Sequence, residues 1–467
     1  MRQRPLSDVA TVVAGSVRGN ANIAVRGAVV DSREARPGEL FVALPGQHAD
    51  GHDFVGDAMA RGAAAAMVRR GWTGGAETTV EVDDPGSALL RLAGSERSAI
   101  DAHVVGITGS TGKTITKDFT AAVLGRRFRV LASRASFNNE VGLPLTLLQA
   151  DEGTEAIVCE MGSRGPGQIR RLCEIAAPTV GVVTNVGGAH MELFGSREVL
   201  RDAKAELPEA LPAGGVAVLN ADDPVVRTFG GRTKARVVIF GRRGDADVSA
   251  DAVGLRPETG RAEFVLRTPD GSARVHLPVP GEHMVSNALA AAAVGWALGV
   301  PVERSAEGLA AASVAGGRME VKEAGGVRIV NDAYNANPSS MAAALRAARW
   351  MASSGRSIAV LGPMAELGPI TDEEHERVGG LVARLGIDVL VVVGPEARLI
   401  GAAARREGIP PDAIVVCDDV LQAAEALIHM VRPGDLVLVK ASRVARLERV
   451  ADSLVAALDQ PAQEAAR

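Results

Sequence analysis

Apolar residues recur along this chain in short continuous runs, with stretches of helical spacing between them. The runs predict strands at 40–44, 104–108, 156–159, 180–184, 216–219, 327–330, 357–361, 389–393, 413–417 and 435–439. Helices are predicted at 166–176 and 196–207, and after residue 113, where Ile115, Phe119, Ala122 and Val123 recur at helical intervals up to Gly125. Apolar strands that alternate with helices indicate parallel sheets covered on both faces, so we expect an α/β fold.

Three domains are expected. A small α/β leader spans 1–98 and ends in the polar stretch 95–98, and a central parallel-sheet segment spans 99–315. The last segment, 316–467, repeats the alternation and is interpreted as a second doubly wound, Rossmann-like domain. Two of its helix starts are marked by sequence, one by Asn337-Pro338 and one by a capping box of Thr371 and Glu374. A cleft between two such domains suits a two-substrate reaction.

Composition argues against nucleic-acid and membrane proteins. The chain has 467 residues and a net charge of −5, without a basic run interleaved with aromatics, so no nucleic-acid partner is expected. Its three cysteines lack metal-ligand spacing and are expected to be reduced. The N-terminus lacks a signal-peptide pattern, and the longest apolar run, 288–300, is too short to span a bilayer. We therefore expect a soluble, cytoplasmic protein.

The run from Val104 to Phe119 predicts a nucleotide site. Its strand stops at a loop of small residues, which continues into a helix that opens with a lysine and a threonine; these residues are Gly109, Ser110, Thr111, Gly112, Lys113 and Thr114. Backbone N–H groups and the helix N-terminus of such a loop surround phosphates, while Lys and Thr reach the β/γ-phosphates and Mg²⁺. The strict P-loop pattern would have Gly at Ile107, and a plain Gly-rich turn is the alternative.

Lysine is rare in this chain. Only six of the 51 basic residues are lysines, so those that remain are expected where a guanidinium would not serve. Lys113 fits a phosphate contact, and Lys204 and Lys440 lie in unusual local sequence. An ordinary surface lysine is the alternative for Lys204. The other three, Lys117, Lys234 and Lys322, are interpreted as solvated.

Polar side chains follow several predicted strands. Glu160 comes directly after one central strand and Asn185 after the next, with His190 five residues on, so all are expected at the rim that carries Lys113. Glu160 is a candidate Mg²⁺ ligand and His190 a candidate ligand of a second cation. The alternatives are a solvated carboxylate and a loop histidine held by the backbone.

In the last segment, a dense polar cluster follows the strand at 327–330. Ahead of that strand, Arg318 is a candidate for binding a phosphate with two hydrogen bonds. Directly after it, Asp332 is a candidate acceptor from a ribose or an anchor for a loop. An asparagine-rich turn is the alternative interpretation of the cluster.

Seven motifs, in this order, resemble the Mur ligase family over nearly the whole chain. They are DSR with DGHDFV (31–33 and 50–55), TGSTGKT (108–114), FNNEVGLPLTLL (137–148), EMGSRGPGQI (160–169), TNVGGAHMELFGS (184–196), NDAYNANPSSM (331–341) and KASR (440–443). The fourth and sixth resemble the branch that joins D-alanyl-D-alanine to UDP-N-acetylmuramoyl-tripeptide. The resemblance implies an ATP-dependent amide ligase of peptidoglycan precursor synthesis, with two Mg²⁺ ions and an acyl-phosphate intermediate. We expect the protein to be a monomer.

The resemblance also implies a role for each matching residue. Ser32, Arg33, Leu44 and Gly46 would hold the uridine diphosphate, and Asn138, Asn139 and Glu140 would line the muramoyl-peptide channel. Lys113 and Thr114 would bind ATP phosphates and Mg²⁺, with Glu160, His190 and a carbamylated Lys204 as further metal ligands. Asn287 would contact adenine, Arg318, Asp332 and Tyr334 would close on ATP, and Ser442 and Arg443 would take the dipeptide's carboxylate.

Three positions depart from the family pattern. Pro363 stands where LGDM has Asp, Ala441 where KGSR has Gly, and Met284 where Asn or Gln is frequent. Because two of them lie in the domain expected to recognise the dipeptide, a paralogue using another amine, such as D-Ala-D-Lac or a specialised-metabolite amine, stays open. A folate-polyglutamate ligase and an ATP-driven switch for a protein partner are further alternatives, which the UDP-type residues disfavour.

Overall fold

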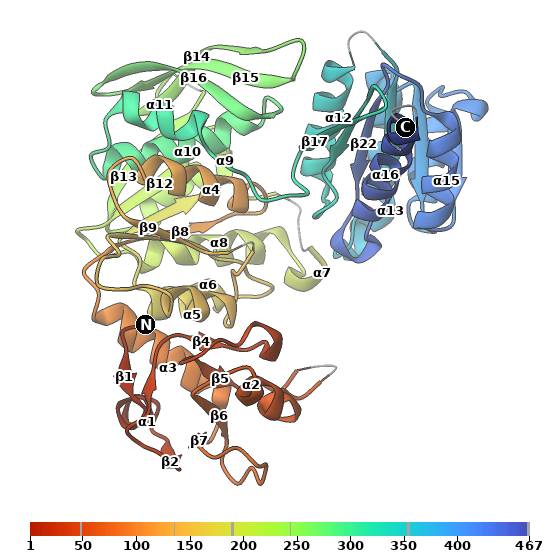
Figure 1. Ribbon diagram of the computed structural model, residues 1–467. Coiled ribbons are helices and arrows are strands. Elements are labelled where there is room, and N and C mark those ends of the chain that lie inside the picture. The colour runs from red at the N-terminus through yellow and green to blue at the C-terminus, as the bar shows by residue number, and fades with distance from the viewer. Residues whose placement is uncertain (47–48, 135, 188–190, 243, 353–354, 465–467) are drawn as a thin grey trace.

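The computed structural model describes residues 1–46, 49–134, 136–187, 191–242, 244–352 and 355–464. Within them the chain forms three α/β bodies that follow one another in sequence (Figure 1). The N-terminal body is red to orange, the central body orange to green, and the C-terminal body blue. None of the helices in these ranges is both long and apolar enough to cross a membrane.

The N-terminal body is a small mixed sheet with helices against it. In the described residues the strand order is β2-β7-β6-β5-β4, and only β2 runs antiparallel to its neighbour. The strands are β2 (Ser16–Arg18), β4 (Ala28–Val29), β5 (Leu40–Val42), β6 (Ala65–Arg69) and β7 (Thr79–Val82), with β1 (Arg4–Pro5) paired to β3 (Ala24–Val25) apart from them. The helices are α1 (Leu6–Val13), α2 (Val55–Ala60) and α3 (Pro85–Ser98). The apolar cluster of Leu40, Met67 and Leu89 continues into the central body through Leu143 and Leu172, which fixes one body on the other.

The central body carries the predicted parallel strands. Its sheet has the order β16-β15-β14-β13-β12-β11-β8-β10-β9 in the described residues. The strands are β8 (His103–Thr108), β9 (Val130–Ala132), β10 (Ala156–Glu160), β11 (Val180–Val183), β12 (Val216–Asn220), β13 (Arg236–Gly241), β14 (Val248–Leu255), β15 (Arg261–Thr268) and β16 (Gly271–Pro280). The helices are α4 (Lys113–Leu124), α5 (Gly142–Leu147), α6 (Gln168–Ala176), α7 (Met191–Phe194), α8 (Arg197–Ala210), α9 (Pro224–Arg227), α10 (Met284–Ala297) and α11 (Val302–Ala310).

The register of the central strands builds the expected rim. Glu160 pairs with Ile107 across β10 and β8, and Val183 pairs with Thr108 across β11 and β8. Since parallel strands end at the same edge, the residues after β8, β10 and β11 emerge side by side. This confirms the placement of Glu160 beside the strand that leads to Lys113.

An antiparallel extension of this sheet was not predicted. β14 pairs antiparallel with β15, and β15 pairs antiparallel with β16 through a two-residue turn at Pro269 and Asp270. The sequence did hold a signal, because Pro-Asp-Gly between two runs of alternating apolar and polar residues is typical of a turn.

The C-terminal body is a second doubly wound sheet. Its order in the described residues is β17-β18-β22-β19-β20-β21, with β17 antiparallel at one edge. The strands are β17 (Glu320–Ala324), β18 (Val327–Asn331), β19 (Ser357–Leu361), β20 (Val389–Val393), β21 (Ile414–Cys417) and β22 (Leu436–Lys440). The helices are α12 (Pro338–Met351), α13 (Thr371–Leu385), α14 (Arg398–Arg406), α15 (Val420–Met430) and α16 (Glu448–Glu464).

The two predicted helix starts of this body have different outcomes. The Asn337 side chain accepts from Ser340 N at 2.9 Å, and the Ser340 hydroxyl accepts from Asn337 N at 3.0 Å, so this cap is confirmed. The capping box of Thr371 and Glu374 is wrong. Helix α13 begins at Thr371 itself, and the Thr371 hydroxyl donates to Gly368 O at 2.7 Å instead.

The prediction that Lys117 is solvated is also wrong. Lys117 is 3% exposed, and its Nζ lies 2.8 Å from Ser133 O and 2.6 Å from the Asp118 carboxylate. The reason is tertiary, because α4 is enclosed by β9, β10 and α10 and leaves no free face for a lysine. By contrast, Lys234 is exposed just before β13, so the prediction that it is solvated is confirmed.

Candidate functional site

The loop between β8 and α4 has the backbone of a phosphate cradle. Gly109 has φ +145° and Gly112 φ +78°, conformations that favour glycine. A Cβ on Gly109 would overlap Thr184 Oγ1, and a Cβ on Gly112 would overlap Asn287 Oδ1. Both glycines are therefore required by backbone conformation and by space.

The segment after β11 closes on this loop. Thr111 N donates to Asn185 Oδ1 at 2.9 Å, and Asn185 Nδ2 donates to Thr111 Oγ1 at 2.8 Å. Gly187 N donates to Ser110 Oγ at 2.9 Å. The loop thus holds its shape through protein contacts alone. His190, three residues further on, lies outside the described residues.

Glu160 is a buried carboxylate with neutral partners. It is 2% exposed, and it accepts from Thr114 Oγ1 at 2.6 Å and from Asn138 Nδ2 at 2.8 Å. Within the described ranges, no group of three or more His, Cys, Asp and Glu side chains could hold a metal ion. A metal here would therefore be held by hydroxyl and carboxylate oxygens together with ligand atoms, as Mg²⁺ often is.

Two buried or half-buried lysines lie near this carboxylate. Lys113 Nζ donates to Gly109 O at 2.8 Å, and burial lowers the pKa of Lys113 while the charge of Glu160 raises it. Lys204 is 1% exposed and donates to Ser163 Oγ at 2.9 Å. Burial, and then the charge of Lys113, lower the pKa of Lys204 to about 7. The alternative of a surface lysine at 204 is therefore wrong.

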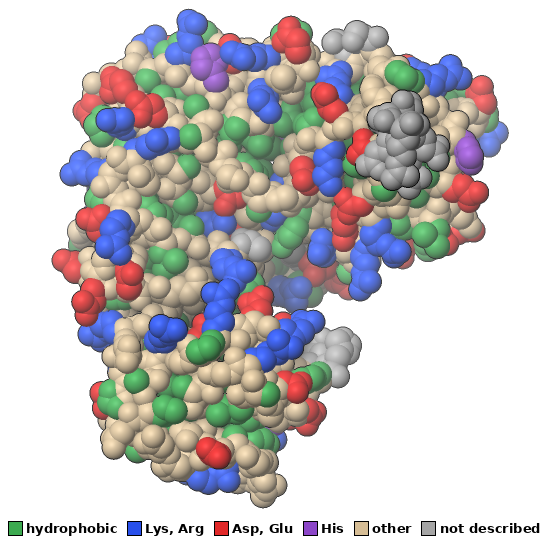
Figure 2. Space-filling view, in the orientation of Figure 1, with side chains coloured by type: hydrophobic (Ala, Val, Ile, Leu, Met, Phe, Trp, Pro, Cys, Tyr) green, Lys and Arg blue, Asp and Glu red, His purple; other side chains and the backbone are tan. Residues whose placement is uncertain are grey.

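Arg318 reaches from the C-terminal body to the loop. Its Nη2 donates to Thr114 Oγ1 at 2.9 Å and to Ser136 Oγ at 3.1 Å. Its guanidinium lies 3.7 Å from the centroid of the Tyr334 ring, within cation–π distance. The space-filling view shows a hollow between the central and C-terminal bodies, with Lys and Arg side chains along its edges (Figure 2).

Asp332 is held by hydrogen bonds and an ion pair within the C-terminal body. Lys440 Nζ lies 2.6 Å from Asp332 Oδ2 and donates to Asn335 O at 2.9 Å, while Met319 N donates to Asp332 Oδ1 at 3.1 Å. This arrangement matches the interpretation of Asp332 as a loop anchor. It also accounts for Lys440, one of the rare lysines.

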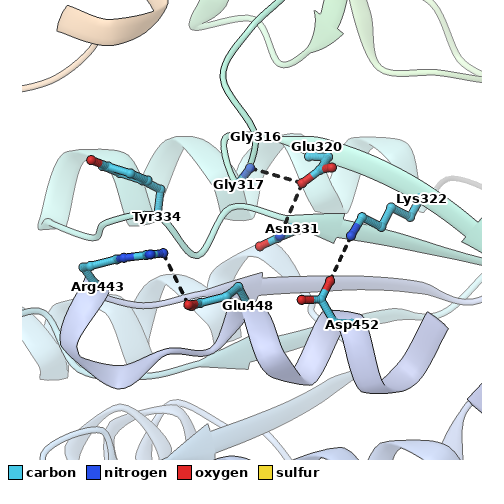
Figure 3. A pocket seen from close by; sticks show the side chains of 9 residues that line it. All are labelled: Gly316, Gly317, Glu320, Lys322, Asn331, Tyr334, Arg443, Glu448 and Asp452. Carbon is cyan, nitrogen blue, oxygen red and sulfur yellow. Dashed lines mark hydrogen bonds and ion pairs between the residues drawn. The ribbon is translucent and has the colours of Figure 1, made fainter. Parts of the chain in front are cut away.

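Ser442 and Arg443 have different surroundings. Ser442 is 2% exposed, and its hydroxyl accepts from Ala365 N at 2.8 Å and donates to Ala336 O at 3.2 Å. Arg443 is exposed and lines a pocket of 260 Å³ beside Tyr334 (Figure 3). The charged side chains of that pocket pair among themselves, Arg443 with Glu448 at 3.3 Å and Lys322 with Asp452 at 2.9 Å.

The remaining predicted residues lie on either side of the loop. Ser32 is buried, whereas the exposed Arg33 pairs with Asp31 at 2.6 Å and, by this hydrogen bond, lowers the Asp31 pKa to about 2. Leu44 is half-buried and Gly46 exposed, on either side of Pro45, which forms an isolated β-bridge with Asp50. Asn287 is buried under Gly112, Asn139 Oδ1 accepts from Gly142 N at 2.9 Å, and Glu140 is half-buried between Asn139 and α5.

Several supporting residues were not predicted. Asp223 accepts from Val186 N at 2.8 Å, and Asn220 Nδ2 donates to Thr184 O at 2.7 Å, so both hold the segment that closes on the loop. Glu206 accepts from Gly167 N at the start of α6. Asp223 had a readable signal, since Asp before Pro is typical of a helix start. For Glu206, which lies within a helix, the sequence offers none.

Known proteins resemble the whole chain. Family models described as "Mur ligase family, catalytic domain", "Mur ligase middle domain" and "Mur ligase, glutamate ligase domain" match residues 24–82, 107–295 and 317–443. A UDP-N-acetylmuramoyl-tripeptide–D-alanyl-D-alanine ligase of Mycobacterium tuberculosis is 43% identical, with 98% of both chains covered. The chain belongs to the Mur ligase family. A MurF crystal structure from Acinetobacter baumannii superposes on this Mur ligase with a TM-score of 0.87, 31% identity, and 98% and 99% of the two chains covered.

A second solved structure shows a bound nucleotide. MurF from Thermotoga maritima, in complex with ADP, has a TM-score of 0.81 and 33% identity to this Mur ligase, covering 94% of this chain and 99% of the other. The three unusual positions can be placed in this fold. Pro363 is half-buried, and its carbonyl oxygen accepts from Ser442 N at 2.9 Å. Ala441 is fully buried, and a Cβ added at Gly362 would lie 2.7 Å from the Ala441 Cβ. Alanine at 441 is therefore accommodated because residue 362 is a glycine. Met284 is buried at the start of α10.

Proposed function

We propose that this Mur ligase joins D-alanyl-D-alanine to UDP-N-acetylmuramoyl-tripeptide, with ATP as the energy source, in the synthesis of peptidoglycan precursors. The identity to relatives of that name supports this assignment over nearly the whole chain. The observation that supports this proposal most strongly is that the central and C-terminal bodies meet at Thr114. Its hydroxyl contacts both the buried Glu160 of the central body and Arg318 of the C-terminal body. A ligase needs this arrangement because a second body must close over the body that binds ATP while the substrate carboxylate is activated.

ATP is proposed to lie on the loop between β8 and α4. The N–H groups of 109–112 and the start of α4 would bind its phosphates, and Lys113 would leave Gly109 O to pair with them. The ADP complex of the Thermotoga relative supports this placement. Asn287 would contact the adenine, and Asp332 and Tyr334 would approach the nucleotide from the C-terminal body.

The donor set at this edge fits Mg²⁺. Thr114 and Glu160 offer hard oxygen ligands, and the buried Glu160 carboxylate has only neutral hydrogen-bond partners in the described part of the chain. They would hold one ion, and His190 with a carbamylated Lys204 would hold a second. Bound there, Mg²⁺ would neutralise charge on the phosphate oxygens. The lowered pKa of Lys204 supports carbamylation, because a neutral amine adds to CO₂ and releases a proton.

The reaction then follows from charge and position. The terminal carboxylate of the tripeptide attacks the γ-phosphorus, the bond to ADP breaks, and Lys113 and Arg318 stabilise the negative oxygens. The dipeptide's amine attacks the acyl phosphate, loses a proton, and phosphate leaves. The protein binds and orients both substrates and excludes water, and the reaction needs no covalent enzyme nucleophile.

The substrate sites are proposed on both sides of the nucleotide. Ser32, Arg33, Leu44 and Gly46 would hold the uridine diphosphate, and Asn138, Asn139 and Glu140 the peptide that leads to the acyl centre. Arg443 would bind the dipeptide's carboxylate after its ion pair with Glu448 breaks. The Ser442 hydroxyl, which accepts from Ala365 N, would fix the adjacent turn. We take the boundaries 1–98, 99–315 and 316–467 as the domains and a monomer as the acting form.

The test is phosphate release by the purified chain with ATP, Mg²⁺ and UDP-N-acetylmuramoyl-tripeptide. We expect release to require D-alanyl-D-alanine, with the pentapeptide product seen by mass spectrometry. D-Ala-D-Lac and single amino acids form the comparison arms. Release that is faster with another amine would assign the chain to a paralogous reaction, and release indifferent to every amine would contradict a ligase altogether.

A further inference from the structure

A ring of polar contacts joins the central and C-terminal bodies around Thr114. Arg318 Nη2 donates to Thr114 Oγ1 at 2.9 Å, and Thr114 Oγ1 donates to Glu160 Oε2 at 2.6 Å. Glu160 Oε1 accepts from Asn138 Nδ2 at 2.8 Å. Ser136, two residues before Asn138, accepts from Arg318 Nη2 at 3.1 Å and closes the ring through the chain. Arg318 therefore has two hydroxyl acceptors from different elements.

The segment that carries Ser136 is anchored at both ends by the central body. At its start, Ser133 N donates to Val158 O at 3.0 Å, and Lys117 Nζ donates to Ser133 O at 2.8 Å. At its end, Gly162 N donates to Asn138 O at 2.8 Å. These anchors do not involve the C-terminal body, so the two ends of the segment are held independently of Arg318.

The two acceptors of Arg318 differ in what the nucleotide does to them. Thr114 is the hydroxyl proposed above as a Mg²⁺ ligand, and a hydroxyl that gives a lone pair to a divalent cation is a poor acceptor for a guanidinium. A cation beside Thr114 also repels the positive Arg318. Ser136 belongs to the ring but not to the donor set of the metal.

We propose that Ser136 is a positioning residue that keeps Arg318 in the cleft once the Thr114 hydroxyl coordinates the metal. In the free protein, Thr114 and Ser136 share Arg318, and in the Mg²⁺-nucleotide complex Ser136 is the hydroxyl of this pair that still accepts from Arg318 while the guanidinium faces the phosphates. Tyr334 holds the other side of the guanidinium through its ring. This inference rests on the proposed function, because it takes Thr114 as a ligand of the nucleotide's metal.

The test is calorimetric binding of a non-hydrolysable ATP analogue to the full chain, with Mg²⁺ and with a chelator in its place. With Mg²⁺, we expect Ser136→Ala to weaken binding about tenfold, the usual size of a lost hydrogen bond to a charged group. Without Mg²⁺, Thr114 still holds Arg318, and the loss should be about twofold or less. A loss that depends on the metal is not expected if Ser136 only stabilises its loop.

Three variants make the result decisive. Ser136→Thr keeps a hydroxyl and should restore binding, whereas in an Arg318→Ala background Ser136→Ala should have no further effect. Ser133→Ala is the matched control, because this buried hydroxyl of the same segment has no hydrogen-bond partner in the described residues. Equal losses with and without Mg²⁺, or losses that add in the double variant, would overturn the inference alone. A wild-type chain that binds no Mg²⁺-nucleotide would overturn the proposed function as well.

Discussion

The central and C-terminal bodies each bring lysine and carboxylate side chains to the edge of a parallel sheet, and they use them in opposite ways. In the C-terminal body, Lys440 and Asp332 lie 2.6 Å apart and fix the turn after β18. In the central body, Glu160, Lys113 and Lys204 hydrogen-bond only neutral groups in the part of the chain that the structure describes. Buried charge that is paired stabilises a loop, whereas buried charge left unpaired is available to a ligand.

The contrast between the central and C-terminal bodies is tested most directly at Lys113. We expect Lys113→Ala to lower phosphate release by about 10³-fold or more, because a phosphate-binding cation is lost from the centre where charge develops. The fold should persist, since Lys113 has no ion pair in the described residues. Phosphate release and thermal unfolding measure the two effects. Lys234→Ala, at an exposed lysine just before β13, is the control and should leave turnover unchanged.

Lys204 and Lys440 form a matched pair for the second test, because they are 1% and 2% exposed. Lys440→Met leaves Asp332 without its cation and should lower the free energy of unfolding by about 3–5 kcal/mol. Lys204→Met removes a buried amine that forms no ion pair in the described residues, so the protein should be as stable as the wild type or more stable, yet lose turnover. Denaturant unfolding and phosphate release separate the two outcomes. Equal destabilisation by both substitutions would abolish the distinction between the two bodies.

The same contrast explains what the sequence could predict. The loop from Gly109 to Thr114 and the strand-end position of Glu160 depend on neighbours in sequence, and both placements were predicted. The pairing of Lys440 with Asp332 joins residues 108 positions apart, and no local pattern encodes it. Lys117 and Lys204 look alike on their helices, and only the packing of neighbouring elements shows that both are buried. The sequence therefore predicts which residue types matter more readily than which of them meet.

The smallest expected effect is a pH dependence that belongs to Lys204. Its pKa is about 7 in the folded protein, against 10.5 for a lysine side chain in water, so the unfolded chain binds the proton more tightly. Between these two pH values the unfolded state carries more protons, and the free energy of unfolding therefore rises with pH through this window. Below it, both states bind the proton, and this group adds no pH dependence. The unfolding temperature of the wild type should rise by a few degrees relative to Lys204→Met between about pH 6 and pH 9. A constant difference between wild type and Lys204→Met over this range would mean that the Lys204 amine is not held unpaired in the interior.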